Sequence, residues 1–242
     1  MRVIQCEQRT PAWLSERAGK VTASGVAHAL AVLKRKDGEA QVRKDYKARI
    51  VAEILTGFSA EQYVSPAMVW GSEQESFAVT AYEIQSGSEL EHVGFVLHPT
   101  IDRFGASPDG LVGDKGMIEA KCPSTTTHLD YILNDVVPEE YQPQMLAGMV
   151  CCERDWCDFV SYDPRLPEHL QLFVKRFERD NERIGLMEAG VLQFLSEVDD
   201  ILARLPQAPP QTAKEESLEQ IKSELDAMWI SEAEVQAHDS RA

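Results

Sequence analysis

Two carboxylates and an amine are spaced in this chain so that they could hold a divalent cation beside a phosphate. Asp109 lies in the turn-forming stretch Ser107-Pro108-Asp109-Gly110, and Glu119-Ala120-Lys121 follows nine residues later. In a strand, residues two apart point to the same face, so Glu119 and Lys121 project together while the Ala120 carbonyl stays near them. Carboxylate and carbonyl oxygens suit Mg²⁺ or Mn²⁺. The pattern predicts metal-assisted hydrolysis of a phosphodiester, with Lys121 orienting the attacking water or neutralising charge on the phosphorus.

The Asp109, Glu119 and Lys121 triplet by itself also fits an exposed hairpin with solvated charges. Its neighbours favour the catalytic interpretation. Ile118 and Ala120 flank Glu119 with apolar side chains, as in a strand that packs on a core. Pro108 and Gly110 form a rigid turn around Asp109, which would fix its carboxylate.

The elements that must position these residues are predicted by hydrophobic period, caps and breakers. Helices are expected from Thr10-Pro11 to Gly19, from Thr22, over 42–55, from Ser65-Pro66 to 85, around 141–150 and over 177–204. Strands are expected at 90–97, 117–122, 156–162 and 169–174, with an extended segment at 103–112 and a turn at 113–116. This order predicts an α/β domain with one mixed central sheet flanked by helices.

The C-terminal region differs in composition from the rest. Three prolines lie between 206 and 212, and an amphipathic stripe follows them. The expected organisation is a nuclease domain at 1–205, a linker at 206–213, and a C-terminal helix and tail at 214–242.

The charge distribution permits a nucleic-acid partner although the net charge is −16. Residues 1–60 carry 11 Lys/Arg and 6 Asp/Glu, whereas the other 182 residues carry 13 and 34. Basic charge concentrated in one part of an acidic chain indicates nucleic-acid contact, and solvated helix faces are the alternative. No apolar run reaches membrane-spanning length and no signal-peptide pattern begins the chain, so a cytoplasmic protein is expected. The five cysteines are expected to be free thiols.

Several motifs in the same order resemble one known family. The central pair is Gly105-Ala106-Ser107-Pro108-Asp109-Gly110-Leu111 with Ile118-Glu119-Ala120-Lys121-Cys122-Pro123. Around it lie Trp13 to Arg17 with Val21-Thr22-Ala23-Ser24, then Trp70-Gly71 with Glu75, Tyr141-Gln142-Pro143-Gln144-Met145, and Tyr162-Asp163-Pro164-Arg165. This series resembles the lambda-type phage exonucleases, the YqaJ-like viral recombinases of the PD-(D/E)xK nuclease superfamily. It covers about two-thirds of the chain, residues 13–165.

The resemblance implies a role for each matching residue. Asp109, Glu119 and the Ala120 carbonyl would be metal ligands, Lys121 the catalytic lysine, and Glu75 a ligand of a second metal ion, directly or through water. Gln142 or Gln144 would hold the attacking water or the phosphate, and Pro143 between them leaves open which one points inward. The pocket for a terminal 5′-phosphate would consist of Arg17, Ser24 and Ser107. Lys34 and Arg35 fall where the family has a basic element near the DNA end.

The family resemblance also implies a function and partners. It implies a Mg²⁺- or Mn²⁺-dependent 5′-to-3′ exonuclease on linear double-stranded DNA, which leaves 3′ single-stranded tails for recombination. The resemblance further implies a ring-shaped homotrimer and a single-strand annealing protein as partner. It also implies that the protein is encoded by a phage or prophage and works in a bacterial cell. Two alternatives stay open: a structure-specific or restriction-type endonuclease on the same fold, and an acidic, non-catalytic binding protein or DNA mimic.

Overall fold

The computed structural model describes residues 1–33, 38–59, 66–206 and residue 220, and residues 1–202 form one compact unit. The expected basic element at Lys34 and Arg35 lies outside the described residues. The expected linker beyond Pro206 and the expected C-terminal helix also lie outside them, apart from Gln220.

The strands form two sheets, whereas the sequence predicted one. The first sheet has the order β1 (Arg2–Ile4), β4 (Phe95–Leu97), β5 (Phe104–Ala106) and β2 (Val21–Thr22). The second has the order β3 (Leu90–Glu91), β6 (Gly110–Val112), β7 (Gly116–Lys121), β8 (Trp156–Tyr162) and β9 (Leu172–Glu178). In the second sheet β7 and β8 are parallel and the other neighbours are antiparallel. The sheets are therefore mixed, as expected for the fold class.

Two expected strands are each divided between the sheets, which corrects the single-strand interpretation of 90–97 and the single extended segment at 103–112. The first division falls at Gly94, where an added Cβ would lie 2.1 Å from the carbonyl oxygen of Cys6. The N-terminal segment thus passes directly over the backbone at this point. The second division is the turn Ser107 to Asp109, where the chain leaves β5 and enters β6. An apolar pattern cannot reveal a change of pairing partner, because both halves are buried in the same way.

Six of the seven described α-helices lie where helices were expected, although the last begins at Asn181 rather than 177, because β9 runs from Leu172 to Glu178. The described helices are α1 (Pro11–Arg17), α2 (Val26–Ala29), α3 (Gln41–Thr56), α4 (Pro66–Ser86), α5 (Thr125–Asn134), α6 (Gln142–Cys151) and α7 (Asn181–Arg204), with 3₁₀ turns η1 (Ala23–Gly25) and η2 (Glu168–Leu170). The Thr10 hydroxyl caps α1 by accepting from the Trp13 N–H at 3.3 Å, and Gly57 ends α3 with a φ of 73°. Helix α5 was not predicted, because its first turn is three threonines that favour strands. None of the described helices has a stretch long and apolar enough to cross a membrane.

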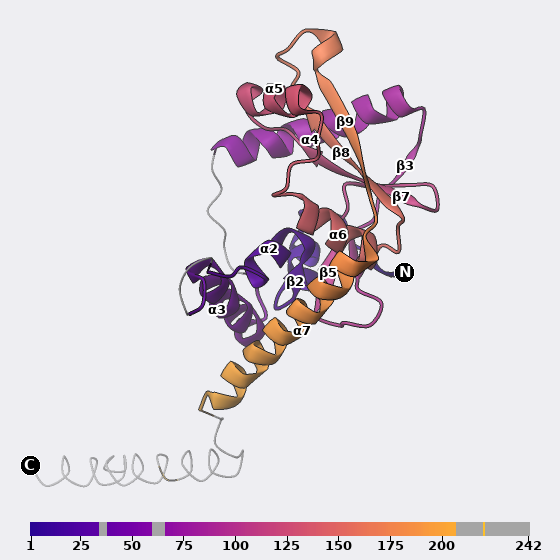
Figure 1. The fold of residues 1–242 in the computed structure, drawn as a ribbon. Coiled ribbons are helices and arrows are strands. Elements are labelled where there is room, and N and C mark those ends of the chain that lie inside the picture. Colours follow the sequence, from indigo (N-terminus) through magenta and orange to yellow (C-terminus); the bar gives the residue numbers. More distant parts are fainter. Residues whose placement is uncertain (34–37, 60–65, 207–219, 221–242) are drawn as a thin grey trace, which may run out of the picture. The chain divides into compact units, whose positions relative to one another are not determined.

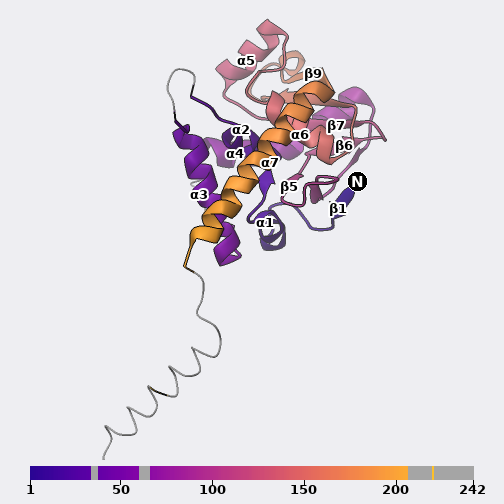
Figure 2. The same cartoon turned by 60° about the horizontal axis from the view of Figure 1, so that its bottom comes forward.

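Helices cover both faces of the five-stranded sheet (Figures 1 and 2). On one face, Ala78 and Tyr82 of α4 pack with Ile118 and Val160 of the central strands. On the other face, Met117 packs in a larger core that contains residues of α6 and α7. Because side chains alternate along β7, Glu119 points with Met117 toward the α6 side.

Part of the N-terminal basic charge is used inside the fold. Arg43 of α3 donates to both carboxylate oxygens of Glu197 on α7, at 2.7 and 2.9 Å, and Lys47 contacts the same carboxylate. Both cations also contact Glu39, at 2.5 and 2.6 Å. Lys47 is buried, because Glu197 of α7 supplies a carboxylate for its ammonium group.

Candidate active site

The edge of the second sheet brings together the carboxylates that the sequence singled out. Asp109 directly precedes β6, and Gly110 at the start of β6 pairs with Ile118 of β7. The beginning of β6 therefore lies beside the end of β7. The Asp109 carboxylate accepts a hydrogen bond from the Ala120 N–H at 2.7 Å. This contact confirms the expected proximity of Asp109 and the Glu119–Lys121 strand.

Glu119 is the buried centre of this group, with 3% of its surface exposed. Its Oε1 accepts from Gln144 Nε2 at 2.5 Å and from the Lys121 ammonium group. The same ammonium nitrogen lies 5.2 Å from the centre of the Tyr141 ring. Tyr141 begins the stretch Tyr141–Met145 that resembles the family, but the sequence assigned it no role in the site.

Of the two candidate glutamines, the structure brings Gln144 to Glu119 and turns Gln142 away. Gln142 donates to the Val137 carbonyl at 3.1 Å and accepts from Arg183 at 3.1 Å. Residues two apart on a helix lie on nearly opposite faces, so only one of the pair can face the sheet.

Glu75 reaches the same region from α4. Its Oε2 accepts from Arg9 Nη2 at 2.6 Å, and Arg9 Nη1 donates to the Ser72 carbonyl at 3.1 Å. Arg9, Glu75 and Asp109 line one cavity of about 610 Å³. Arg9 was not singled out by the sequence, because it precedes α1 in a segment with no periodic pattern and its partner lies 66 residues away.

The electrostatics of the site show that its carboxylates repel one another. Burial, followed by the charges of Glu119 and Glu75, raises the pKa of Asp109 well above its usual range. Burial also raises the pKa of Glu75, although Arg9 and Lys121 oppose this. Burial alone would lower the pKa of Lys121, but the charges of Glu119 and Asp109 outweigh it and raise that pKa.

These side chains fit a divalent metal ion by donor type and by charge. Three carboxylates and the Ala120 main chain offer the hard oxygen donors that Mg²⁺ and Mn²⁺ prefer. A cation would offset the repulsion that raises the pKa of Asp109. Within the described ranges, no three His, Cys, Asp or Glu side chains form a ready-made metal cluster, and the carboxylates contact Arg9, Lys121, Gln144 and the Ala120 N–H.

A second polar cluster, at the place expected for the 5′-phosphate pocket, lies two residues upstream of Asp109. The Ser107 hydroxyl accepts from Arg17 Nη1 at 3.2 Å and from Trp13 Nε1 at 2.8 Å. The Arg17 guanidinium also stacks on the Trp13 ring, 4.1 Å from its centre. Burial lowers the pKa of Arg17 to about 10, and none of the described carboxylates forms a salt bridge with it. Arg17 and Ser107 thus lie together, as expected. Trp13 contacts both of them, although the sequence assigned it no role in this cluster.

Ser24, the other residue expected in this pocket, is exposed. Its hydroxyl lies 3.2 Å from that of Thr22, and within the described ranges it makes no hydrogen bond with Arg17 or Ser107. Its phosphate-binding role stays a prediction.

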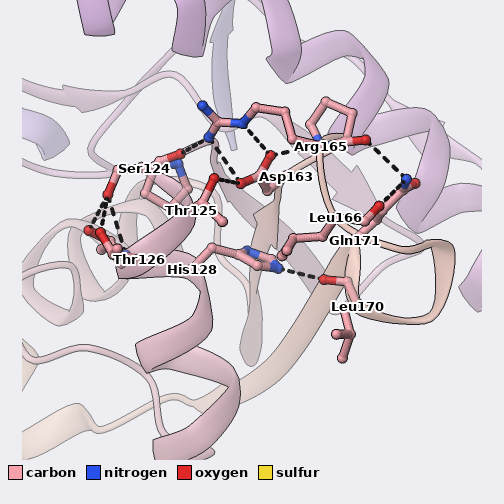
Figure 3. Close-up of polar contacts among 12 residues, drawn as sticks. Ser124, Thr125, Thr126, His128, Asp163, Arg165, Leu166, Leu170 and Gln171 are labelled. Atoms are coloured by element: carbon pink, nitrogen blue, oxygen red, sulfur yellow. Dashed lines mark hydrogen bonds and ion pairs between the residues drawn. The ribbon is translucent and has the colours of Figure 1, made fainter.

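A further polar cluster follows β8, and Figure 3 shows it from close by. Asp163 is fully buried, and its carboxylate accepts from Arg165 Nε and Nη2 at 2.7 and 2.9 Å and from the Thr125 hydroxyl at 2.6 Å. Beside it, the buried His128 ring contacts the Ser161 hydroxyl at 2.7 Å and the Leu170 carbonyl at 2.9 Å. Burial would raise the pKa of Asp163, but the hydrogen bonds from Arg165 and Thr125 outweigh it and lower the pKa to about 2.

Asp163→Asn is therefore expected to lower the free energy of unfolding at neutral pH by about 1–2 kcal/mol. A depressed carboxyl pKa stabilises the fold above the unfolded value of 3.8, and this stabilisation is lost as pH falls toward the folded value of about 2. The difference between wild type and variant should shrink over that pH range in urea titrations. Asp102→Asn is the control: it removes an exposed carboxylate that pairs with Arg2 and should change the free energy of unfolding by at most about 1 kcal/mol. An equal difference at pH 2 and 7 would contradict this origin.

The chain resembles known proteins in sequence and in fold. Residues 12–155 match the model of the YqaJ-like viral recombinase domain. Two structures of the alkaline exonuclease LHK-Exo from Laribacter hongkongensis, one of them with dAMP, share 42% and 41% identity with the chain at TM-scores of 0.72 and 0.73. Each alignment covers 89% of this chain and 100% of the other.

A more distant structure, a phage-related exonuclease from Haemophilus somnus 129PT, shares the fold at 18% identity and a TM-score of 0.62, covering 77% of this chain and 96% of that one. No curated protein sequence matches the chain. The expected PD-(D/E)xK fold is confirmed by the two closer structures. The chain belongs to the YqaJ-like viral recombinase family.

Proposed function

We propose that this chain is a Mg²⁺- or Mn²⁺-dependent exonuclease that degrades one strand of linear duplex DNA from its 5′ end and leaves a 3′ single-stranded tail for recombination. The broader class, a nuclease acting on DNA, follows from the family and from the identity of 41–42% with an alkaline exonuclease. The observation that supports the finer proposal is the pocket of Arg17 and Ser107, whose serine lies two residues before Asp109.

The end selectivity would come from this pocket. Arg17 is held by the Trp13 ring and by Ser107, with no carboxylate salt bridge among the described residues. A terminal phosphate would supply the missing negative charge through charge-assisted hydrogen bonds. A strand bound by its 5′-phosphate there would place a nearby linkage at Asp109 and Glu119. Cleavage close to an anchored end is exonucleolytic.

The residues at the sheet edge would divide the catalytic work. Asp109, Glu119 and the Ala120 carbonyl would hold one metal ion, and Glu75 would contribute to a second. A divalent metal bound there polarises the phosphoryl group and lowers the pKa of bound water. Lys121 would donate to a phosphate oxygen and neutralise charge that develops on it. Gln144 holds the Glu119 carboxylate in place through its 2.5 Å hydrogen bond.

The assembly and partners are part of the same proposal. We infer a ring-shaped homotrimer around the DNA and a single-strand annealing protein as partner, both from the family resemblance. The surplus of Lys/Arg in residues 1–60, in a chain of net charge −16, is consistent with a basic channel inside an acidic particle. Sedimentation of the full chain at micromolar concentration tests the trimer.

The function is tested with a linear duplex that carries a 5′-phosphate and a label on each strand in turn. Loss of the 5′-phosphorylated strand alone, with Mg²⁺ but not with EDTA, is expected. Cuts in closed circular DNA would instead support the endonuclease alternative. Absence of cleavage with Mg²⁺ and with Mn²⁺ would support a non-catalytic binding protein.

Arg17→Met should remove the preference for a 5′-phosphate over a 5′-hydroxyl end. Hydrogen bonds to charged groups contribute about 1.5–3 kcal/mol, so kcat/KM on phosphorylated ends should fall by about 10- to 100-fold. Activity on hydroxyl ends should change much less. The matched control is Arg103→Met, which removes a surface ion pair with Asp199. An Arg17 variant that still prefers phosphorylated ends would show that Arg17 does not recognise the 5′-phosphate.

A further inference from the structure

Arg165 is held rigidly and still presents part of its guanidinium to solvent. Two of its nitrogens are fixed by the buried Asp163 carboxylate, and its guanidinium carbon lies 4.3 Å from the centre of the Trp70 ring. Its side chain is nevertheless 50% exposed, and Nη1 has no hydrogen-bond partner among the described residues. Figure 3 shows the guanidinium extending past Asp163 with one nitrogen free of dashed contacts. An arginine held in this way offers a donor with little conformational entropy left to lose on binding.

The position of Arg165 is at the same sheet edge as the candidate active site. β7 and β8 are parallel, and Lys121 pairs with Ser161, so Asp163 follows the end of β8 where Pro123 follows the end of β7. Arg165 Nη2 reaches the Pro123 carbonyl at 3.4 Å. The ends of β7 and β8 are one strand spacing apart, about 4.8 Å.

Helix α4 gives the same placement from the other side of the site. Trp70, which stacks on Arg165, precedes Glu75 by five residues of the helix. This separation is about 7.5 Å along the helix axis. Between them, Gly71 faces the Cys122 carbonyl oxygen, which would lie 3.6 Å from an added Cβ. Arg165 therefore lies close to the candidate metal-binding carboxylates, on the side of the β8 end.

The order of the strands in the sheet shows on which side of the candidate cleavage site Arg165 lies. Ser107 and Asp109 precede β6, Glu119 and Lys121 end β7, and Asp163 follows β8, in the spatial order β6, β7, β8. The pocket for a 5′-phosphate and Arg165 thus lie on opposite sides of the cleavage site. A strand that has its 5′ end at Arg17 and a linkage at Glu119 would continue toward Arg165.

We propose that Arg165 binds the phosphate immediately 3′ of the scissile one in the strand being degraded, with Asp163 and Trp70 holding its guanidinium in position. This inference rests on the proposed function. The contact is to the DNA backbone, so it carries no base preference. It would keep the strand aligned after each nucleotide is removed, because the next phosphate moves into the same site.

The chain contains a matched control in Arg176. It also forms two hydrogen bonds with a buried aspartate, Asp158, at 2.8 and 3.0 Å, stacks over a tryptophan, Trp156, at 3.5 Å, and is 48% exposed. Asp158 lies near the start of β8, whereas Asp163 lies beyond its end. The two arginines share their construction and differ in their place relative to the site.

The test compares Arg165→Gln, Arg176→Gln and wild type in binding a 5′-phosphorylated duplex in Ca²⁺, measured by fluorescence anisotropy. A second duplex carries an uncharged methylphosphonate at the linkage between the second and third nucleotides. Wild type and Arg176→Gln should bind the second duplex about tenfold more weakly than the first. Arg165→Gln should bind the first about tenfold more weakly and lose little more on the second. The slope of log affinity against log salt should fall by about 1 for Arg165→Gln alone.

Equal affinities of Arg165→Gln and Arg176→Gln, or an Arg165 variant as sensitive to the uncharged linkage as wild type, would overturn the proposal. If Arg165→Gln does not fold, Arg165→Lys keeps a cation beside Asp163 and should show a smaller sensitivity to the uncharged linkage than wild type. The outcomes also separate this inference from the proposed function. If the wild type digests the 5′-phosphorylated strand but Arg165→Gln binds DNA as tightly as the wild type, this inference alone is wrong. If the wild type neither binds nor digests the duplex, both this inference and the proposed function are wrong.

Discussion

Replacing Glu119 with glutamine is expected to reduce the rate of DNA degradation by about 10³-fold or more, a loss of at least about 4 kcal/mol of transition-state stabilisation. Glutamine keeps the size of the side chain and can still accept from Gln144, so the buried site should keep its shape. What disappears is one of three carboxylate charges that would hold the metal, at the position where Lys121 and Gln144 converge.

The measurement for Glu119→Gln is the single-turnover rate on the 5′-phosphorylated duplex, together with Mn²⁺ binding by calorimetry. Both should fall, while the thermal unfolding midpoint without metal stays the same or rises, because repulsion with Asp109 is relieved. Glu188→Gln is the control, since it changes a partly exposed carboxylate outside the site, which contacts His98 at 2.8 Å. A Glu119 variant within tenfold of wild type would exclude this carboxylate from metal binding.

Lys121→Met is expected to lower kcat by about 10²- to 10³-fold, the loss typical for removing one donor that stabilises transition-state charge. The charges of Glu119 and Asp109 raise the pKa of Lys121 in the metal-free site, which favours the ammonium form of this side chain. In the proposed mechanism Lys121 therefore acts as a cation beside the phosphate. Methionine keeps the length of the side chain and its packing beside Tyr141.

The Lys121 prediction separates chemistry from binding. KM and the affinity for a 5′-phosphorylated end in Ca²⁺ should change only a few-fold, because in the proposed function Arg17 and Ser107 would bind that end. Lys115→Met is the control: it removes a lysine on the β6–β7 turn that pairs with Asp155 at 3.4 Å. An unchanged kcat would show that another group supplies the charge, and an equal fall in DNA affinity would assign Lys121 to binding.

Much of the site follows from short-range rules. The spacing of Glu119 and Lys121 places both on one face of β7, and the turn at 113–116 brings β6 back beside it, so Asp109 reaches the Ala120 N–H. The helices α1 and α3 were predicted because their limits are marked by Thr10-Pro11 and by Gly57. Such signals act within a few residues and need no knowledge of the fold.

Other features depend on contacts that local sequence patterns do not encode. Arg9 pairs with Glu75, which lies 66 residues later in the sequence. Lys47 is buried because it pairs with Glu197 of α7, which lies 150 residues later. Trp13 joins the Arg17 pocket through Ser107, 94 residues further on. From the sequence alone, Arg9, Lys47 and Trp13 resemble ordinary surface residues. Their charge or polarity does not reveal which distant residue they contact in the fold.

The sequence by itself indicated the family through motifs that resemble it, and it predicted the carboxylates and the lysine of the candidate site because turns and strand alternation act locally. Only the tertiary structure decided the division into two sheets, the contact of Gln144 rather than Gln142 with Glu119, and the placement of Arg165 beside the candidate active site. Each of these depends on which strands become neighbours. That choice is made by burial of apolar faces between distant segments, and apolar faces of similar pattern are interchangeable until the whole chain packs.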